Sequence, residues 1–100
     1  MRLRALIVAS TMMAAAVGTA AAQQFVRNTD RPGSDYSNFE IGGIPDLCRT
    51  PCLKDRRCQA WTFVKPGIQG RRAHCWLKDR VPPAVTNSCC ISGTRAVRID

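Results

Sequence analysis

The 100-residue chain is poor in the groups that catalysis requires. His74 is its only histidine, and its seven acidic side chains are scattered, mostly at positions typical of turns and helix ends. None of its serines lies in a nucleophile elbow, and no Cys-x-x-Cys redox motif is present. Acid–base and nucleophilic catalysis both need several such groups to converge on one place. We therefore expect neither an enzyme nor a bound cofactor or metal.

The chain also lacks an apolar run long enough to span a bilayer, which takes about 20 residues. Its N-terminus instead has a charged start (MRLR), a shorter apolar stretch (ALIVASTMMAAAVG) and a small-residue ending (TAAAQQ). This order is typical of a secretory signal peptide. No twin-arginine pair and no cysteine near the cleavage point are present. We predict a signal peptide at residues 1–22, no membrane span, and export to the periplasm or the cell exterior.

The mature domain is then expected at residues 23–100, with its core at about 25–95. All six cysteines lie in it: Cys48, Cys52, Cys58, Cys75, Cys89 and Cys90. An even number of cysteines in a short exported chain predicts a disulfide framework. Zinc sites favour two closely spaced pairs of ligands, which this spacing does not offer. A core of this size supplies only about 3–5 kcal/mol net, so covalent staples are expected.

The middle of the chain predicts a β-hairpin. CQAWTFV (58–64) and AHCWLK (73–78) are rich in β-branched and aromatic residues, and a long basic loop separates them. Trp61 and Phe63 should face one side of the first strand, and we expect Trp61 to be buried. Flanking these we predict weaker strands at 23–29 and 91–99, alternation at Phe39 and Ile41, a turn-rich loop at 30–38 and an irregular surface segment at 79–90.

One segment, IPDLCRTPCLKD (44–55), has helical spacing of its apolar residues and cysteines. Cys48 and Cys52 are four residues apart and would share one face of the helix. If Asp46 caps the start, Pro51 lies inside the helix, where it costs about 3 kcal/mol. Alternatively Thr50 is the cap and Pro51 takes the first helical position, which proline tolerates well. Both starts remain open.

The order of these features resembles the PAN/apple domain family, and its small bacterial members in particular. Cys-x3-Cys on a helix precedes CQAWTFV and then HCWLKD, while DRPGSDYSNFEI upstream and VPPAVTNSCCISG downstream are also similar. The resemblance spans about residues 25–95. It implies an α+β fold, in which a curved antiparallel sheet is crossed by one short helix.

The resemblance also implies which cysteines pair. Two disulfides would staple the helix to the central hairpin, Cys48–Cys75 and Cys52–Cys58. The family's frequent third disulfide, which joins the two ends of the domain, is excluded because no cysteine precedes Cys48 in the predicted mature chain. A bond between the neighbours Cys89 and Cys90 is the simplest completion, although pairings in which one of them takes Cys48 or Cys75 stay open.

By the same resemblance, we expect a binding module that recognises protein or carbohydrate through the sheet face and its loops. The mature chain would carry 13 basic and 7 acidic residues, a net charge of +6. Arginine suits planar anionic groups. We therefore predict ligand contacts, including contacts to an anionic ligand, at Lys65, Arg71, Arg72 and Trp76, and no nucleic acid partner. Alternatively, the basic residues only keep the domain soluble.

Two other functions fit the composition. One is a structural envelope protein that associates electrostatically with anionic polysaccharide or lipid headgroups; salt would screen this attraction beyond about 8–10 Å. The other is a small inhibitor or toxin-like scaffold, for which the chain shows no exposed reactive-site loop. The sequence points to no particular oligomeric state.

Overall fold

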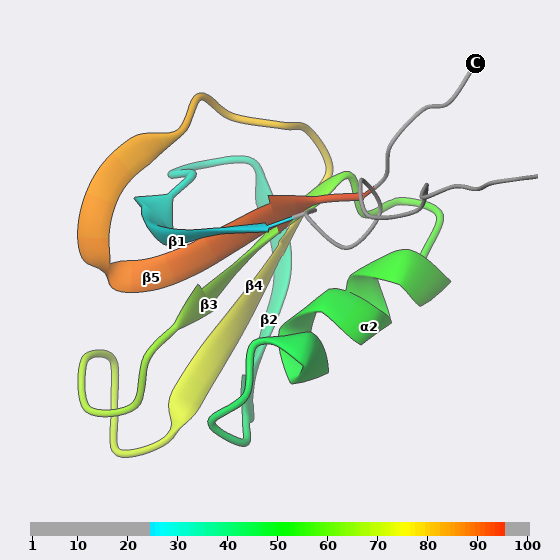
Figure 1. Ribbon diagram of the computed structural model, residues 1–100. Coiled ribbons are helices and arrows are strands. Elements are labelled where there is room, and N and C mark those ends of the chain that lie inside the picture. Colours follow the sequence, from blue (N-terminus) through cyan, green and yellow to red (C-terminus); the bar gives the residue numbers. More distant parts are fainter. Residues whose placement is uncertain (1–24, 96–100) are drawn as a thin grey trace, which may run out of the picture.

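In the part of the chain that the structure describes, a five-stranded antiparallel sheet is crossed on one face by one helix (Figure 1). The computed structural model describes residues 25–95, so the expected signal peptide and residues 96–99 of the expected last strand lie outside the described residues. Residues 91–94 of that expected strand do lie in a strand. The elements are β1 (Phe25–Asp30), β2 (Asp35–Ile41), α2 (Asp46–Lys54), β3 (Ala60–Val64), β4 (Ala73–Lys78) and β5 (Val85–Thr94). The sheet order is β1-β5-β3-β4-β2. The predicted α+β fold is confirmed.

The central strand is β3, which pairs with β4 on one edge and with β5 on the other. All five of its residues are buried, because α2 covers one face of the sheet and other segments cover part of the opposite face. Trp61 and Phe63 lie on the helix side and belong to the hydrophobic core. Each large side chain buried in this way contributes about 1.5–3 kcal/mol. The predicted hairpin and the burial of Trp61 are confirmed.

The helix α2 begins at Asp46 and contains Pro51, so the first of the two predicted starts is the observed one. The expected cap at Asp46 is wrong: Pro45 occupies the N-cap position, and no side chain caps the helix there. The chain has already turned before Asp46, because the Pro45 carbonyl accepts hydrogen bonds from the amides of Cys48 and Arg49, at 2.8 and 3.1 Å.

Two disulfides hold this helix, and both predicted pairings are confirmed. Cys48–Cys75 joins α2 to β4, and Cys52–Cys58 joins the last turns of the helix to the segment before β3. All four cysteines are buried. Pro51 lies between the two stapled positions of the helix. The covalent links on both sides explain why a nine-residue helix tolerates a proline that an isolated helix would not.

The end of α2 is also held from the far end of the chain. The Arg95 guanidinium donates to the carbonyl oxygens of Cys52, Asp55 and Cys58, at 2.9, 3.0 and 3.0 Å. These carbonyls lie at or just beyond the helix C-terminus, where intrahelical partners run out. A cation is favoured at this end of the helix dipole.

Two segments that were expected to be irregular contain strands, so those predictions are wrong in part. The loop predicted at 30–38 spans only 31–34, because β2 begins at Asp35 and pairs with β4. The surface segment predicted at 79–90 ends at 84, because β5 begins at Val85 and pairs with β1. The Asp, Ser and Asn residues in both segments have low strand propensity. Pairing with a neighbouring strand overrides that preference.

A large bulge interrupts the pairing of β1 with β5. Arg27 pairs with Ile91 and Thr29 with Thr86, so one residue of β1 faces four residues (87–90) of β5. The single residue, Asn28, has a left-handed backbone with φ of 52°. A bulge bends its strand, and β5 does bend sharply at this place (Figure 1). Its first half curls over the sheet face opposite α2.

On the helix side, β2 is tied to the segment after α2. The Tyr36 hydroxyl donates to Asp55 Oδ2 at 2.6 Å, and the Arg57 guanidinium lies over the Tyr36 ring at 4.4 Å. Burial, followed by the bond to Asp55, raises the pKa of Tyr36 to about 12. The same bond, followed by the Arg57 amide, lowers the pKa of Asp55.

Ultraviolet titration of the phenolate should test this contact. Tyr36 is the only tyrosine, so its absorbance change should have a midpoint near 12 while circular dichroism shows a folded domain; the ordinary value is 10.0. The Asp55→Asn variant should move the midpoint only part of the way back, because burial is the larger cause. A wild-type midpoint at the ordinary value would contradict the contact.

The same pKa shifts fix how the contact contributes to stability. The contribution of neutral Tyr36 is full below its ordinary pKa of 10.0 and is lost as pH rises towards 12. The contribution of ionised Asp55 is full above its ordinary pKa of 3.8 and is lost as pH falls through its lowered pKa. The difference in unfolding free energy between wild type and Tyr36→Phe should therefore be constant near neutrality and shrink at both extremes.

Candidate ligand-binding pocket

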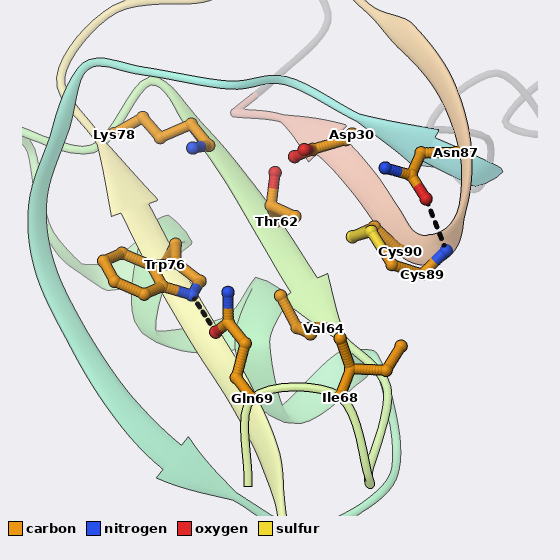
Figure 2. A pocket seen from close by; sticks show the side chains of 10 residues that line it. All are labelled: Asp30, Thr62, Val64, Ile68, Gln69, Trp76, Lys78, Asn87, Cys89 and Cys90. Carbon is orange, nitrogen blue, oxygen red and sulfur yellow. Dashed lines mark hydrogen bonds between the residues drawn. A yellow bond between two sulfur atoms is a disulfide. The ribbon is translucent and has the colours of Figure 1, made fainter.

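The sheet face opposite α2 carries a pocket of about 400 Å³ (Figure 2). Small-molecule sites in proteins typically have about 300–1,000 Å³. Alternate side chains of β3 and β4 form its floor, the loop between these strands forms one side, and the end of β1 with the bulge of β5 forms the other. The lining residues are Asp30, Thr62, Val64, Ile68, Gln69, Trp76, Lys78, Asn87, Cys89 and Cys90.

One wall of the pocket is a disulfide between adjacent residues. The structure joins Cys89 to Cys90, as the simplest of the predicted pairings has it, and leaves no free cysteine in the chain. The bond lies in the β5 bulge, which is held by the Lys65 amide donating to the Cys89 carbonyl at 3.0 Å. Asp30 lies close to both sulfur atoms. Because these sulfurs are bonded to each other and are not thiolates, this group does not make a metal site.

Trp76 lies across the pocket from that disulfide (Figure 2). It is half-buried, its indole N–H donates to Gln69 Oε1 at 2.8 Å, and its ring contacts the His74 ring at a centroid distance of 5.2 Å. The β3–β4 loop is thereby fastened to the sheet through a lining residue. An indole fixed in this way offers a rigid apolar surface to a ligand.

The one cation among the lining residues is already neutralised. The Lys78 side chain is 3% exposed, and its ammonium donates to Asp35 Oδ1 at 2.5 Å and to the Gly33 carbonyl at 3.3 Å. A buried charge needs such partners. Lys78 therefore anchors the loop before β2 over this face and is not available as a free positive charge.

Of the four predicted contact residues, the structure places only Trp76 in the pocket lining. Lys65, Arg71 and Arg72 lie in the β3–β4 loop but do not line the pocket, and the loop contributes Ile68 and Gln69 instead. Arg71 and Arg72 are exposed, and Arg72 lies 3.9 Å from Glu40. A ligand contact by these three basic residues stays a prediction.

The sequence-based prediction missed five polar residues of the lining: Asp30, Thr62, Gln69, Lys78 and Asn87. Lys78 could have been predicted, because Trp76 and Lys78 are two residues apart on a predicted strand and therefore lie on the same face of the sheet. No sequence pattern pointed to Asp30 or Asn87. The bulge in β5 places both residues at the pocket. The sequence around each of them is rich in turn-forming residues, so the strands to which they belong were not predicted.

Comparison with known proteins agrees with this architecture. The family model of the PAN domain matches residues 29–78. An uncharacterised protein of Acanthamoeba polyphaga mimivirus is 39% identical over 54 residues, which are 54% of this chain and 14% of that protein. This chain thus corresponds to a small part of that relative's length.

Within residues 25–95, no helix is long and apolar enough to cross a membrane. PAN domains generally mediate binding to proteins or carbohydrates. The match covers β2, α2, β3 and β4, including both disulfides that staple the helix. Half of the chain is therefore accounted for by one domain family, and the chain belongs to the PAN domain family.

Proposed function

We propose that this chain is an exported, non-enzymatic binding module. It recognises a protein or carbohydrate ligand through the sheet face opposite α2 and the adjoining β3–β4 loop. The observation that carries the proposal is the pocket on this face, which the loop borders through Ile68 and Gln69. The general role of PAN domains supports the same conclusion.

Export is part of the proposal. The signal peptide is assigned to residues 1–22 and the binding domain to residues 23–100. Three disulfides support this assignment, because such bonds persist in oxidising compartments such as the periplasm or the extracellular space.

Loop variants test the contact surface. Replacing Arg71 and Arg72 by Ala should weaken binding to extracted cell-surface polysaccharide and protein by about tenfold, the loss typical of a side chain that contributes to an interface. Stability should change little, because both residues are exposed and an exposed pair such as Arg72–Glu40 is worth about 0–1 kcal/mol. Surface-immobilised extracts and a soluble, oxidised protein provide the binding measurement.

The matched control removes the same charge elsewhere. Lys54→Ala with Arg56→Ala changes two exposed basic residues at the end of α2 and should leave binding unchanged. If both double variants lose binding equally, and wild-type retention on a sulfated-glycan column disappears at raised salt, the chain associates electrostatically with anionic polymer. That outcome would overturn the proposal in favour of an envelope-associated structural role.

A further inference from the structure

We propose that the pocket binds one neutral sugar ring, placed between the indole of Trp76 and the Cys89–Cys90 disulfide. This inference rests on the proposed function and names the ligand class for the same face. The two apolar surfaces lie on opposite sides of the pocket (Figure 2). The C–H faces of a pyranose ring can pack against both, while its hydroxyl groups meet the polar residues around them.

Two side-chain amides present donors to this space. The Gln69 amide oxygen accepts from the Trp76 indole, and the Asn87 amide oxygen accepts from the Cys89 backbone N–H at 3.0 Å. Indole and backbone N–H groups can only donate, so chemistry fixes the orientation of both amides. Their NH₂ groups remain and point into the pocket (Figure 2).

The acceptors come from Asp30 and Thr62. One carboxylate oxygen of Asp30 accepts the Arg31 amide at 2.7 Å, and the other has no hydrogen-bond partner within residues 25–95. The Ser92 hydroxyl donates its only hydrogen to the Thr29 carbonyl, at 2.9 Å. The 2.7 Å bond between the Thr62 and Ser92 hydroxyls must therefore be donated by Thr62, which leaves the Thr62 oxygen as an acceptor.

This mixed set selects for hydroxyl groups, which both donate and accept. An anionic ligand would meet the Asp30 carboxylate, while the one lining cation, Lys78, is already engaged by Asp35. An ammonium group could pair with Asp30, but a ligand with donors alone would leave the NH₂ groups of Gln69 and Asn87 without an acceptor. The basic loop outside the pocket thus does not determine what the pocket itself accepts.

Neutral monosaccharides and a charged analogue of the same configuration test the inference. Methyl glucoside, galactoside and mannoside are titrated into the oxidised protein, followed by the uronic acid of whichever configuration binds. The readout is the NMR signal of the Trp76 indole N–H. The chain has two tryptophans, so only two indole signals need to be assigned. We expect a dissociation constant on the order of 1 mM, which is typical of a ligand with about a dozen heavy atoms. The uronic acid should bind at least about tenfold more weakly, because its carboxylate would meet Asp30.

Variants of Trp76 and Asp30 test the pocket residues directly. Trp76→Ala should weaken sugar binding at least about tenfold, whereas Trp76→Phe keeps an aromatic surface and should retain most of it. Asp30→Asn should reduce the discrimination against the uronic acid. Lys54→Ala with Arg56→Ala, two exposed residues at the end of α2 and outside the lining, should bind the monosaccharide as wild type does. Comparison of the Ala and Phe variants distinguishes loss of the platform from loss of the fold.

Three results would overturn the inference: no sugar shifts the indole signal, the uronic acid binds more tightly than the neutral sugar, or folded Trp76→Ala binds as wild type does. The proposed function would survive each of them if the loop variants still abolished binding to extracted ligands. It would fail separately if those loop variants had no effect.

Discussion

Replacing Cys48 and Cys75 together by Ala should lower the free energy of unfolding by about 3.6 kcal/mol. This is the loop-closure entropy that a cross-link spanning 28 residues removes from the unfolded chain. The bond joins α2 to β4. Apolar packing adds little to hold α2 on the sheet, because Ile44, Leu47 and Leu53 are exposed. A loss of this size corresponds to a melting temperature lower by about 15–25 °C for a domain of this length.

Urea unfolding of the three double-cysteine variants provides both the measurement and its controls. Removing Cys52–Cys58, which closes a seven-residue loop, should cost about 2.4 kcal/mol. Removing Cys89–Cys90 should cost least, since adjacent residues enclose almost no chain. Equal losses in all three variants, or a reversed order, would contradict the view that the helix is held on the sheet mainly by the longest staple.

The substitution Asp35→Asn should destabilise the domain by about 3 kcal/mol, at the lower end of the range for breaking a buried ion pair. It leaves the Lys78 ammonium, whose side chain is 3% exposed, without a negative charge beside it and with neutral acceptors only, the Gly33 carbonyl and the new amide oxygen. The reverse change, Lys78→Met, should cost about 1 kcal/mol or less. It leaves only the Asp35 carboxylate without its partner, and this side chain is 33% exposed and can be hydrated.

The double variant completes this cycle. With both charges removed, a methionine of similar length fills the space of Lys78, so Asp35→Asn with Lys78→Met should regain most of the stability that Asp35→Asn alone loses. Chemical denaturation at neutral pH gives the four unfolding free energies. If the two single variants were equally destabilised, the asymmetric burial of the pair would not govern its energetics.

Local patterns were sufficient for the helix side of the molecule. The alternation of Trp61 and Phe63 with smaller residues predicted both the hairpin and its buried face. The four-residue spacing of Cys48 and Cys52 predicted a shared helix face, and the family resemblance implied the partners of these cysteines. These features depend on residues close together in the chain or on the order of a few motifs, so they can be read in one dimension.

The pocket side was predicted much less well, because its residues meet through long-range pairing. Trp76 was expected to contact ligand and does line the pocket, whereas the turn-rich stretches containing Asp35 and Asn87 were expected to be irregular. Strand pairing with β4 and β1 orders these stretches although their residues have little intrinsic preference for strands. The bulge opposite Asn28 brings Asp30, Asn87 and the Cys89–Cys90 disulfide together. No local sequence pattern predicts this bulge.

By itself, the sequence determined the class of protein: a small, cysteine-rich α+β domain with a stapled helix, a central hairpin and a basic loop. Only the tertiary structure decided which polar groups are still available for a ligand. Availability depends on what each group already bonds, and Lys78, Gln69 and Asn87 find their partners through contacts that the folded chain creates. A charge or an amide in a sequence therefore indicates a potential contact, and the fold determines whether that contact has already been used.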